Sequence, residues 1–167
     1  PILVEEYLDG REFTVAIIEK ANNDLSVCSI EIIPSQSKDG LRILGEKAKK
    51  ENTEILKTIE EDELKKTIEK LACDSFIGLG VRDFGSIDVK MNKEGECFFI
   101  EANLVPGMTE CSDYFPKAYE ISQNLSYDNV VKLMIEKAIK RVPCSIAENI
   151  NTIVIPPMDL NANMINI

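Results

Sequence analysis

The chain has no histidine and no tryptophan, and only 6% of its 167 residues are aromatic. The missing histidine excludes imidazole acid–base catalysis and histidine-ligated metal sites. No apolar run is long enough to cross a membrane and no signal peptide is visible, so we expect a cytoplasmic protein. The odd cysteine count and the absence of a C-x-x-C pair indicate reduced thiols used mainly in packing, and no zinc site: Cys28, Cys73, Cys97, Cys111 and Cys144.

Positive charge is also scarce. Nineteen lysines and arginines stand against 29 acidic residues, and the formal net charge is -10. Such a surface repels nucleic acid and anionic membranes, so we expect neither as a partner. What the chain does have is 44% hydrophobic residues, enough for one globular domain with a real core.

Apolar spacing predicts the order of the elements. We expect three strands over residues 1–7, 12–19 and 25–33, joined by turns into an antiparallel meander. The charged stretch 47–58 is compatible with a helix. Further along, the pattern predicts these segments: an amphipathic helix over 64–76, strands over 86–91 and 96–102, helices over 116–122 and 126–142, and a short strand-like run over 152–155.

Three oxygen-bearing side chains lie on the two adjacent strands that follow the first helix. Alternation puts Glu101 and Asn103 on one face, and a hairpin through residues 91–96 can bring Asp88 beside them. Two carboxylates and an amide oxygen suit Mg²⁺ that also binds water and phosphate. The alternative is a set of carboxylates on the solvent side of a sheet. The turn-forming loop 104–109, directly after these residues, favours a site.

Two segments carry a family resemblance. Residues 4–15, VEEYLDGREFTV, resemble the segment between the two ATP-grasp lobes of D-alanine–D-alanine ligases. Residues 80–88 followed by 99–109 resemble the metal and product-side motif of that family, and the helix after Ser126 resembles its C-terminal helix. The resemblance implies an α+β ATP-grasp C-terminal lobe over residues 1–142, with helices packed on one side of an antiparallel sheet. Residues 143–167 are then an extension of unknown role.

The resemblance also implies an activity. In this family ATP phosphorylates the carboxylate of one amino acid, and the amine of a second attacks the acyl phosphate to form the peptide bond of a peptidoglycan precursor. Positioning and charge neutralisation dominate such chemistry. The implied cofactors are ATP and two Mg²⁺ ions, with Mn²⁺ as an alternative. Asp88, Glu101 and Asn103 are then the metal ligands.

Six residues are assigned to the nucleotide by the same resemblance. The interlobe segment would line the adenine, and an acidic residue there would bind the ribose hydroxyls. Phe99, expected on the face of Glu101, packs either on the adenine or in the core. Lys49, in a mobile-loop counterpart over residues 45–50, either contacts phosphate or lies on a solvated helix face. The remaining residues are Glu5, Tyr7 and Leu8 at the adenine and Glu12 at the ribose. For Glu5 and Glu12, the alternative is that they are ordinary carboxylates at a strand edge.

On the substrate side, Gly107 matches a glycine whose backbone N–H faces the developing oxyanion. Ser112 matches a serine that holds the carboxylate of the second amino acid; a loop or capping serine is the alternative. The chain departs from the family pattern at Ser86, where an arginine is usual, and we hypothesise that Arg82 substitutes for it.

The resemblance implies further partners as well. A ligase needs an N-terminal substrate domain and a first ATP-grasp lobe, so we expect these, together with small amino-acid substrates, and no turnover from the isolated chain. A homodimer is compatible with this reading. Two alternatives stay open: a ligase for other amino acids, and a non-catalytic module that binds nucleotide or metal or acts in regulation.

Overall fold

The computed structural model describes residues 2, 4–34 and 54–141. The predictions for Lys49, for Cys144, for most of the 47–58 stretch and for the 152–155 run lie outside these residues. Within them, no helix is long and apolar enough to cross a membrane.

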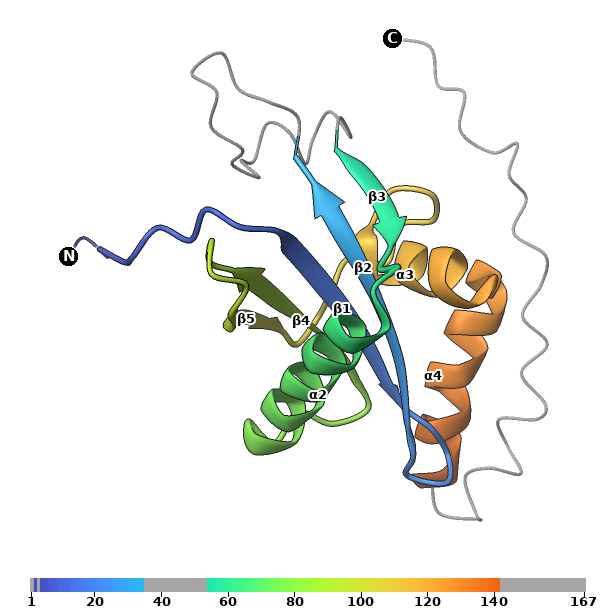
Figure 1. Cartoon of the computed structure of the whole chain (residues 1–167). Coiled ribbons are helices and arrows are strands. Elements are labelled where there is room, and N and C mark those ends of the chain that lie inside the picture. The colour runs from blue at the N-terminus through green and yellow to red at the C-terminus, as the bar shows by residue number, and fades with distance from the viewer. Residues whose placement is uncertain (1, 3, 35–53, 142–167) are drawn as a thin grey trace, which may run out of the picture.

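A five-stranded antiparallel sheet, in the order β3-β2-β1-β4-β5, forms the centre of the fold (Figure 1). The strands are β1 Glu12–Glu19, β2 Leu25–Ile33, β3 Ile55–Thr58, β4 Phe84–Met91 and β5 Cys97–Asn103. The helices are α2 Asp62–Gly78, α3 Tyr114–Gln123 and α4 Tyr127–Arg141. The predictions of β1, β2, β4, β5 and these helices are thereby confirmed.

The predicted three-strand meander is wrong. Residues 4–9 carry no strand, because β1 already pairs with β2 along one edge and with β4 along the other. The helical prediction for 47–58 is wrong at its end, since residues 55–58 pair with β2 as β3. A strand with both edges hydrogen-bonded has no backbone groups left for a third neighbour.

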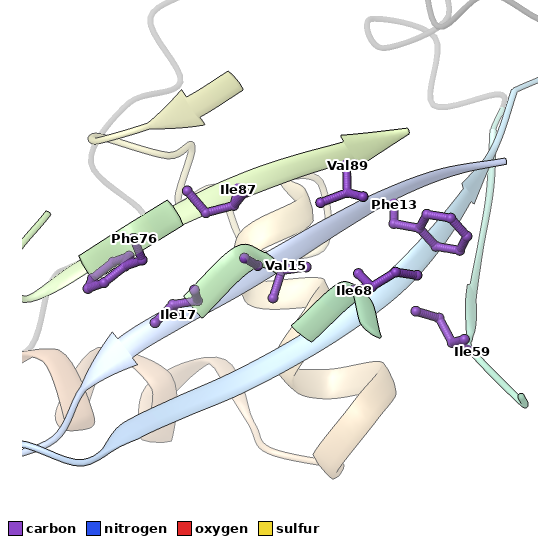
Figure 2. Close-up of a cluster of buried hydrophobic side chains, with 9 residues drawn as sticks. Phe13, Val15, Ile17, Ile59, Ile68, Phe76, Ile87 and Val89 are labelled. Carbon is purple, nitrogen blue, oxygen red and sulfur yellow. The ribbon is translucent and has the colours of Figure 1, made fainter. Parts of the chain in front are cut away.

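One face of the sheet packs against α2. Phe13, Val15 and Ile17 alternate along β1 and are fully buried. They meet Ile68 and Phe76 of α2 in a closed apolar cluster, with Ile87 and Val89 of β4 beside them (Figure 2). This alternation is the period-two pattern of a strand with one face in a core.

The other face packs against α3 and α4. Ala16 and Ile18, the intervening residues of β1, are buried with Phe115 and Tyr119 of α3 and Val130 of α4. Helices therefore cover both faces, which corrects the expectation of helices on one side; the α+β class and the antiparallel sheet are confirmed. The physical reason is the apolar character of both faces of β1, since each must be covered.

Of the described cysteines, none forms a disulfide. Cys28 is buried in the core, Cys73 and Cys97 are half-buried against it, and Cys111 is exposed, so the predicted packing role is confirmed for three of the four described cysteines.

Candidate functional site

The pairing of β4 with β5 brings the three predicted metal ligands together. Asp88 lies opposite Glu101, and Ser86 lies opposite Asn103. Residues directly opposite in an antiparallel pair project from the same face. The three side chains therefore share the sheet face that packs against α3, and Tyr114 at the start of α3 lines the same cavity.

Hydrogen bonds tie these side chains into one cluster. The Thr14 hydroxyl donates to Asp88 Oδ1 at 2.8 Å. The Asn103 amide donates to Asp88 Oδ2 at 3.4 Å and to Glu101 Oε1 at 3.5 Å. Among the described residues, no group of three or more His, Cys, Asp or Glu side chains is placed to hold a metal ion. A cation here would consequently take two carboxylates and one amide from the protein.

A cavity of about 220 Å³ opens beside this cluster. Its wall includes Ser86 from β4 and, from the loop after β5, Gly107 and Ser112. The structure thus places both predicted substrate-side residues next to the metal candidates. The remaining lining residues are Thr14, Asp88, Glu101, Asn103, Val105, Pro106, Asp113, Tyr114 and Phe115.

The loop that carries Gly107 is held by Asp113. The Thr109 backbone N–H donates to Asp113 Oδ2 at 2.6 Å. A Cβ built on Gly107 would stand 2.5 Å from the Asp113 carboxyl carbon, so only glycine fits without moving that carboxylate. The contact between the Asp113 carboxylate and Gly107 therefore holds the Gly107 backbone in place at the cavity wall.

Sequence reasoning missed Thr14 and Tyr114. Thr14 lies between Glu12 and Ala16 on one face of β1, and its role appears only once β1 is paired with β4. Tyr114 opens α3, lines the cavity and donates its phenol hydrogen to Glu54 Oε1 at 2.7 Å. Burial, with the Glu54 hydrogen bond and the charges of Glu54, Glu12 and Asp88, raises the pKa of the Tyr114 phenol, which stays protonated.

A second cavity of about 450 Å³ lies at the edge of β5. It gathers Glu5, Tyr7 and Leu8 with Phe99, all four from the predicted nucleotide set. The neighbours that complete it are Glu6, Lys90, Phe98 and Ile100. Phe98 and Phe99 are each 40% exposed and Ile100 is 48% exposed, so these side chains form an accessible apolar wall.

The expectation that Phe99 shares the face of Glu101 is wrong. The ladder between β4 and β5 is irregular between Asp88 and Val89, where Asp88 pairs with Glu101 but Val89 pairs with Phe99. The extra residue, Ile100, reverses the alternation, so Phe99 follows Val89 toward the α2 face. Phe98, opposite Lys90, is the aromatic residue on the Asp88 face.

Two other predicted residues lie elsewhere. Glu12 accepts a hydrogen bond from Lys90 Nζ at 3.0 Å and lines a separate cavity with Arg11 and Glu31. Arg82 is exposed in the loop before β4, six residues from Asp88, which is about 20 Å along an extended strand. The structure therefore does not bring Arg82 to the cavity as a replacement for the missing arginine.

Comparison with known proteins gives a consistent result. A family model described as D-ala D-ala ligase C-terminus matches residues 1–136. The D-alanine--D-alanine ligase of Aquifex aeolicus is 35% identical over 111 residues, which are 66% of this chain and 35% of that protein. The ligase of Petrotoga mobilis is 29% identical over 144 residues, covering 84% of this chain and 46% of that protein. The chain thus spans less than half the length of these relatives.

Solved structures show the same fold. The D-alanine-D-alanine ligase from Coxiella burnetii matches with a TM-score of 0.63 at 23% identity, over 82% of this chain and 34% of that one. The D-alanine--D-alanine ligase from Bacillus anthracis complexed with ATP matches with a TM-score of 0.62 at 23% identity, over 81% and 40%.

Proposed function

Because this chain belongs to the family of D-alanine–D-alanine ligase C-terminal domains, we propose that it is the metal-binding and nucleotide-binding lobe of an ATP-dependent carboxylate–amine ligase. The reaction would join two small amino acids, D-alanine first among them, through an acyl phosphate, for peptidoglycan precursor synthesis in the cytoplasm. The observation that carries the proposal is the convergence of Asp88, Glu101 and Asn103 on one cavity that also contains Gly107 and Ser112.

The donor set fits Mg²⁺. Two carboxylates and one amide leave coordination positions for water and phosphate oxygens, as Mg²⁺ prefers. Thr14 orients Asp88 through its hydroxyl. Rotating the Asn103 amide by half a turn would present its oxygen in place of the nitrogen that now faces both carboxylates. When bound, one or two Mg²⁺ ions, or Mn²⁺, would neutralise charge on the nucleotide phosphates.

The cavity at the β5 edge is proposed to hold the ATP base. Tyr7, Phe98 and Ile100 offer flat or apolar surfaces, and segment 5–8, which carries no helix or strand, would offer backbone groups to the rim of a purine. Glu12 lines the neighbouring cavity, and Lys90, which lines both cavities, donates to Glu12 Oε2; a ribose hydroxyl beside Lys90 would bind Glu12. The ATP complex of the Bacillus anthracis relative supports a nucleotide on this fold.

On the substrate side, the backbone N–H of Gly107 is proposed to stabilise the developing oxyanion. Ser112 would bind the carboxylate of the second amino acid. Ser86 supplies no positive charge here, and this observation favours a second candidate, a ligase for a different acid or amine. The N-terminal substrate domain and the first ATP-grasp lobe would come from chain outside residues 1–167, and Lys49 stays a candidate phosphate contact.

The test uses the intact protein with MgATP and D-alanine, and follows dipeptide and phosphate release together. We expect dipeptide and phosphate in equal amounts, and no turnover from residues 1–167 alone. A panel of other amino acids in place of D-alanine decides the substrate. If no amino acid in the panel supports phosphate release while MgADP still binds, the lobe is a non-catalytic nucleotide-binding module.

A further inference from the structure

Tyr114 and Glu54 form a hydrogen-bonded pair at the wall of the cavity that contains Ser112. The phenol Oη donates its single hydrogen to Glu54 Oε1 at 2.7 Å. Tyr114 lines the cavity, and Glu54, the residue directly before β3, is not part of its lining. The two residues are 60 positions apart in sequence, so only the folded sheet and α3 bring them together.

The pair leaves acceptors rather than donors for a ligand. Since the phenol proton is committed to Glu54, the oxygen can offer only its lone pairs to a group in the cavity. The second carboxylate oxygen, Glu54 Oε2, is buried and has no hydrogen-bond partner among the described residues. A half-buried carboxylate with one unsatisfied oxygen is costly, and a nearby positive charge would reduce that cost.

Ser86 adds a polar group to the lining of the cavity. Ser86 is 6% exposed and lines the cavity, and its hydroxyl makes no hydrogen bond to another described residue. The described lining residues include Asp88, Glu101 and Asp113 but neither lysine nor arginine. The described wall therefore contains three carboxylates and no cationic side chain, which suits a ligand group that carries positive charge.

We propose that Tyr114 binds the ammonium group of the amine substrate through its phenol oxygen, and that Glu54 is a positioning residue that orients the phenol and supplies the compensating charge. The inference rests on the proposed ligase function and deepens it. With Ser112 two residues before Tyr114, one wall would bind both ends of the same amino acid: its carboxylate at Ser112 and its ammonium at Tyr114.

The variant that tests this is Glu54→Gln in the intact protein. Glutamine keeps an acceptor for the Tyr114 hydroxyl but removes the charge, so a purely structural role predicts no change. We expect KM for D-alanine as the amine substrate to rise roughly 10-fold or more, the size of losing one hydrogen bond to a charged group. Tyr114→Phe is expected to raise the same KM.

The first half-reaction serves as the internal reference. Hydroxylamine traps an acyl phosphate as a hydroxamate without needing the amine substrate, so its rate should stay unchanged in both variants. Glu63→Gln is the matched control, because the Glu63 side chain on α2 is 89% exposed and its carboxylate bonds only Lys66 among the described residues. In this variant, KM for D-alanine as the amine substrate should equal that of the parent protein.

Each outcome decides the proposal. A raised amine KM with unchanged hydroxamate formation supports it. An unchanged amine KM in Glu54→Gln overturns it and leaves the ligase function standing, as does an equal loss of hydroxamate, which would reveal a structural role. If the parent forms no hydroxamate with any amino acid tested, the proposed function fails and this inference fails with it.

Discussion

The two faces of β1 and β4 are built from neighbouring residues but do different work. On the α2 face, Val15, Ile87 and Val89 are at most 1% exposed and belong to one closed apolar cluster. On the opposite face, Thr14 and Asp88, one position along the same strands, line an open cavity. The comparison teaches that stability and chemistry can be separated by a shift of a single residue, because side chains alternate across a sheet.

Charged residues on the two faces differ as well. Glu31, opposite Phe13 on the α2 face, is 5% exposed and accepts two hydrogen bonds from Arg11, at 2.8 and 2.7 Å. Lys57 approaches the same carboxylate at 3.2 Å. On the cavity face, Asp88 accepts hydrogen bonds from the neutral donors Thr14 and Asn103, and Lys90 pairs with Glu12 at 3.0 Å. The first arrangement seals the edge of a core, and the second places Asp88 at the cavity wall, where a metal ion can reach it.

The largest expected effect comes from truncating the closed face. Ile87→Ala removes a side chain that is 1% exposed and leaves a cavity under α2, so we expect a loss of about 2–5 kcal/mol in the free energy of unfolding. Denaturant unfolding measures it. A loss below about 1 kcal/mol would show that this face tolerates a gap and would weaken the contrast between the two faces.

The neighbouring substitution Asp88→Asn addresses the open face. It keeps the size of the side chain and an acceptor for Thr14, so stability should change by less than about 1 kcal/mol. Magnesium-dependent binding of ADP to the intact protein should weaken about 10-fold or more, because one carboxylate ligand is lost. Titration calorimetry with and without Mg²⁺ measures the ADP affinity, and denaturant unfolding measures the stability. Equal ADP affinity in parent and variant would remove Asp88 from the metal site.

How far the sequence alone predicts this molecule differs between these regions. Local alternation and helical spacing predict β1, β2, β4, β5 and α2 but not β3, and the spacing of Glu101 and Asn103 with a hairpin predicts their approach to Asp88. The failures concern long-range pairing. Which strand occupies the free edge of β1 depends on partners more than 60 residues away, and nothing local marks that choice.

The error at Phe99 has a more specific cause. A single unpaired residue, Ile100, reverses the alternation within β5, and periodicity read along a strand assumes that no such residue exists. The role of Tyr114 is not predicted from the sequence, because its partner Glu54 lies 60 positions away and no local pattern links the two. Arg82 is not among the residues that line the cavity, because it precedes β4 and the strand extends away from it before Asp88 is reached.

A smaller effect is expected at Tyr119, a second tyrosine of α3. Its hydroxyl donates to the Ser26 carbonyl at 2.8 Å, and the ring is fully buried on the α3 face. Tyr119→Phe removes this bond and should lower the free energy of unfolding by about 1 kcal/mol. Amine KM and ADP affinity should not change, in contrast to Tyr114→Phe. A change in either would show that the packed and open parts of this face are coupled.

The smallest effect concerns Glu31 and acid. Burial disfavours ionisation of this carboxyl, but the hydrogen bonds from Arg11 and Lys57 outweigh it and lower the pKa of Glu31 below its usual value. A lowered pKa in the folded state gives a stabilising contribution that is complete above the unfolded pKa of about 4.3 and is lost as pH falls through the folded pKa. The free energy of unfolding should therefore decline with acidification below about pH 5, and Glu31→Gln should make that decline shallower. Denaturant midpoints between about pH 3 and pH 6 measure the slopes.

The Glu63→Gln variant, whose parent side chain is 89% exposed, is the control and should keep the slope of the parent. Equal slopes for Glu31→Gln and the parent would mean that the ion pairs at the edge of the closed face contribute nothing to its stability.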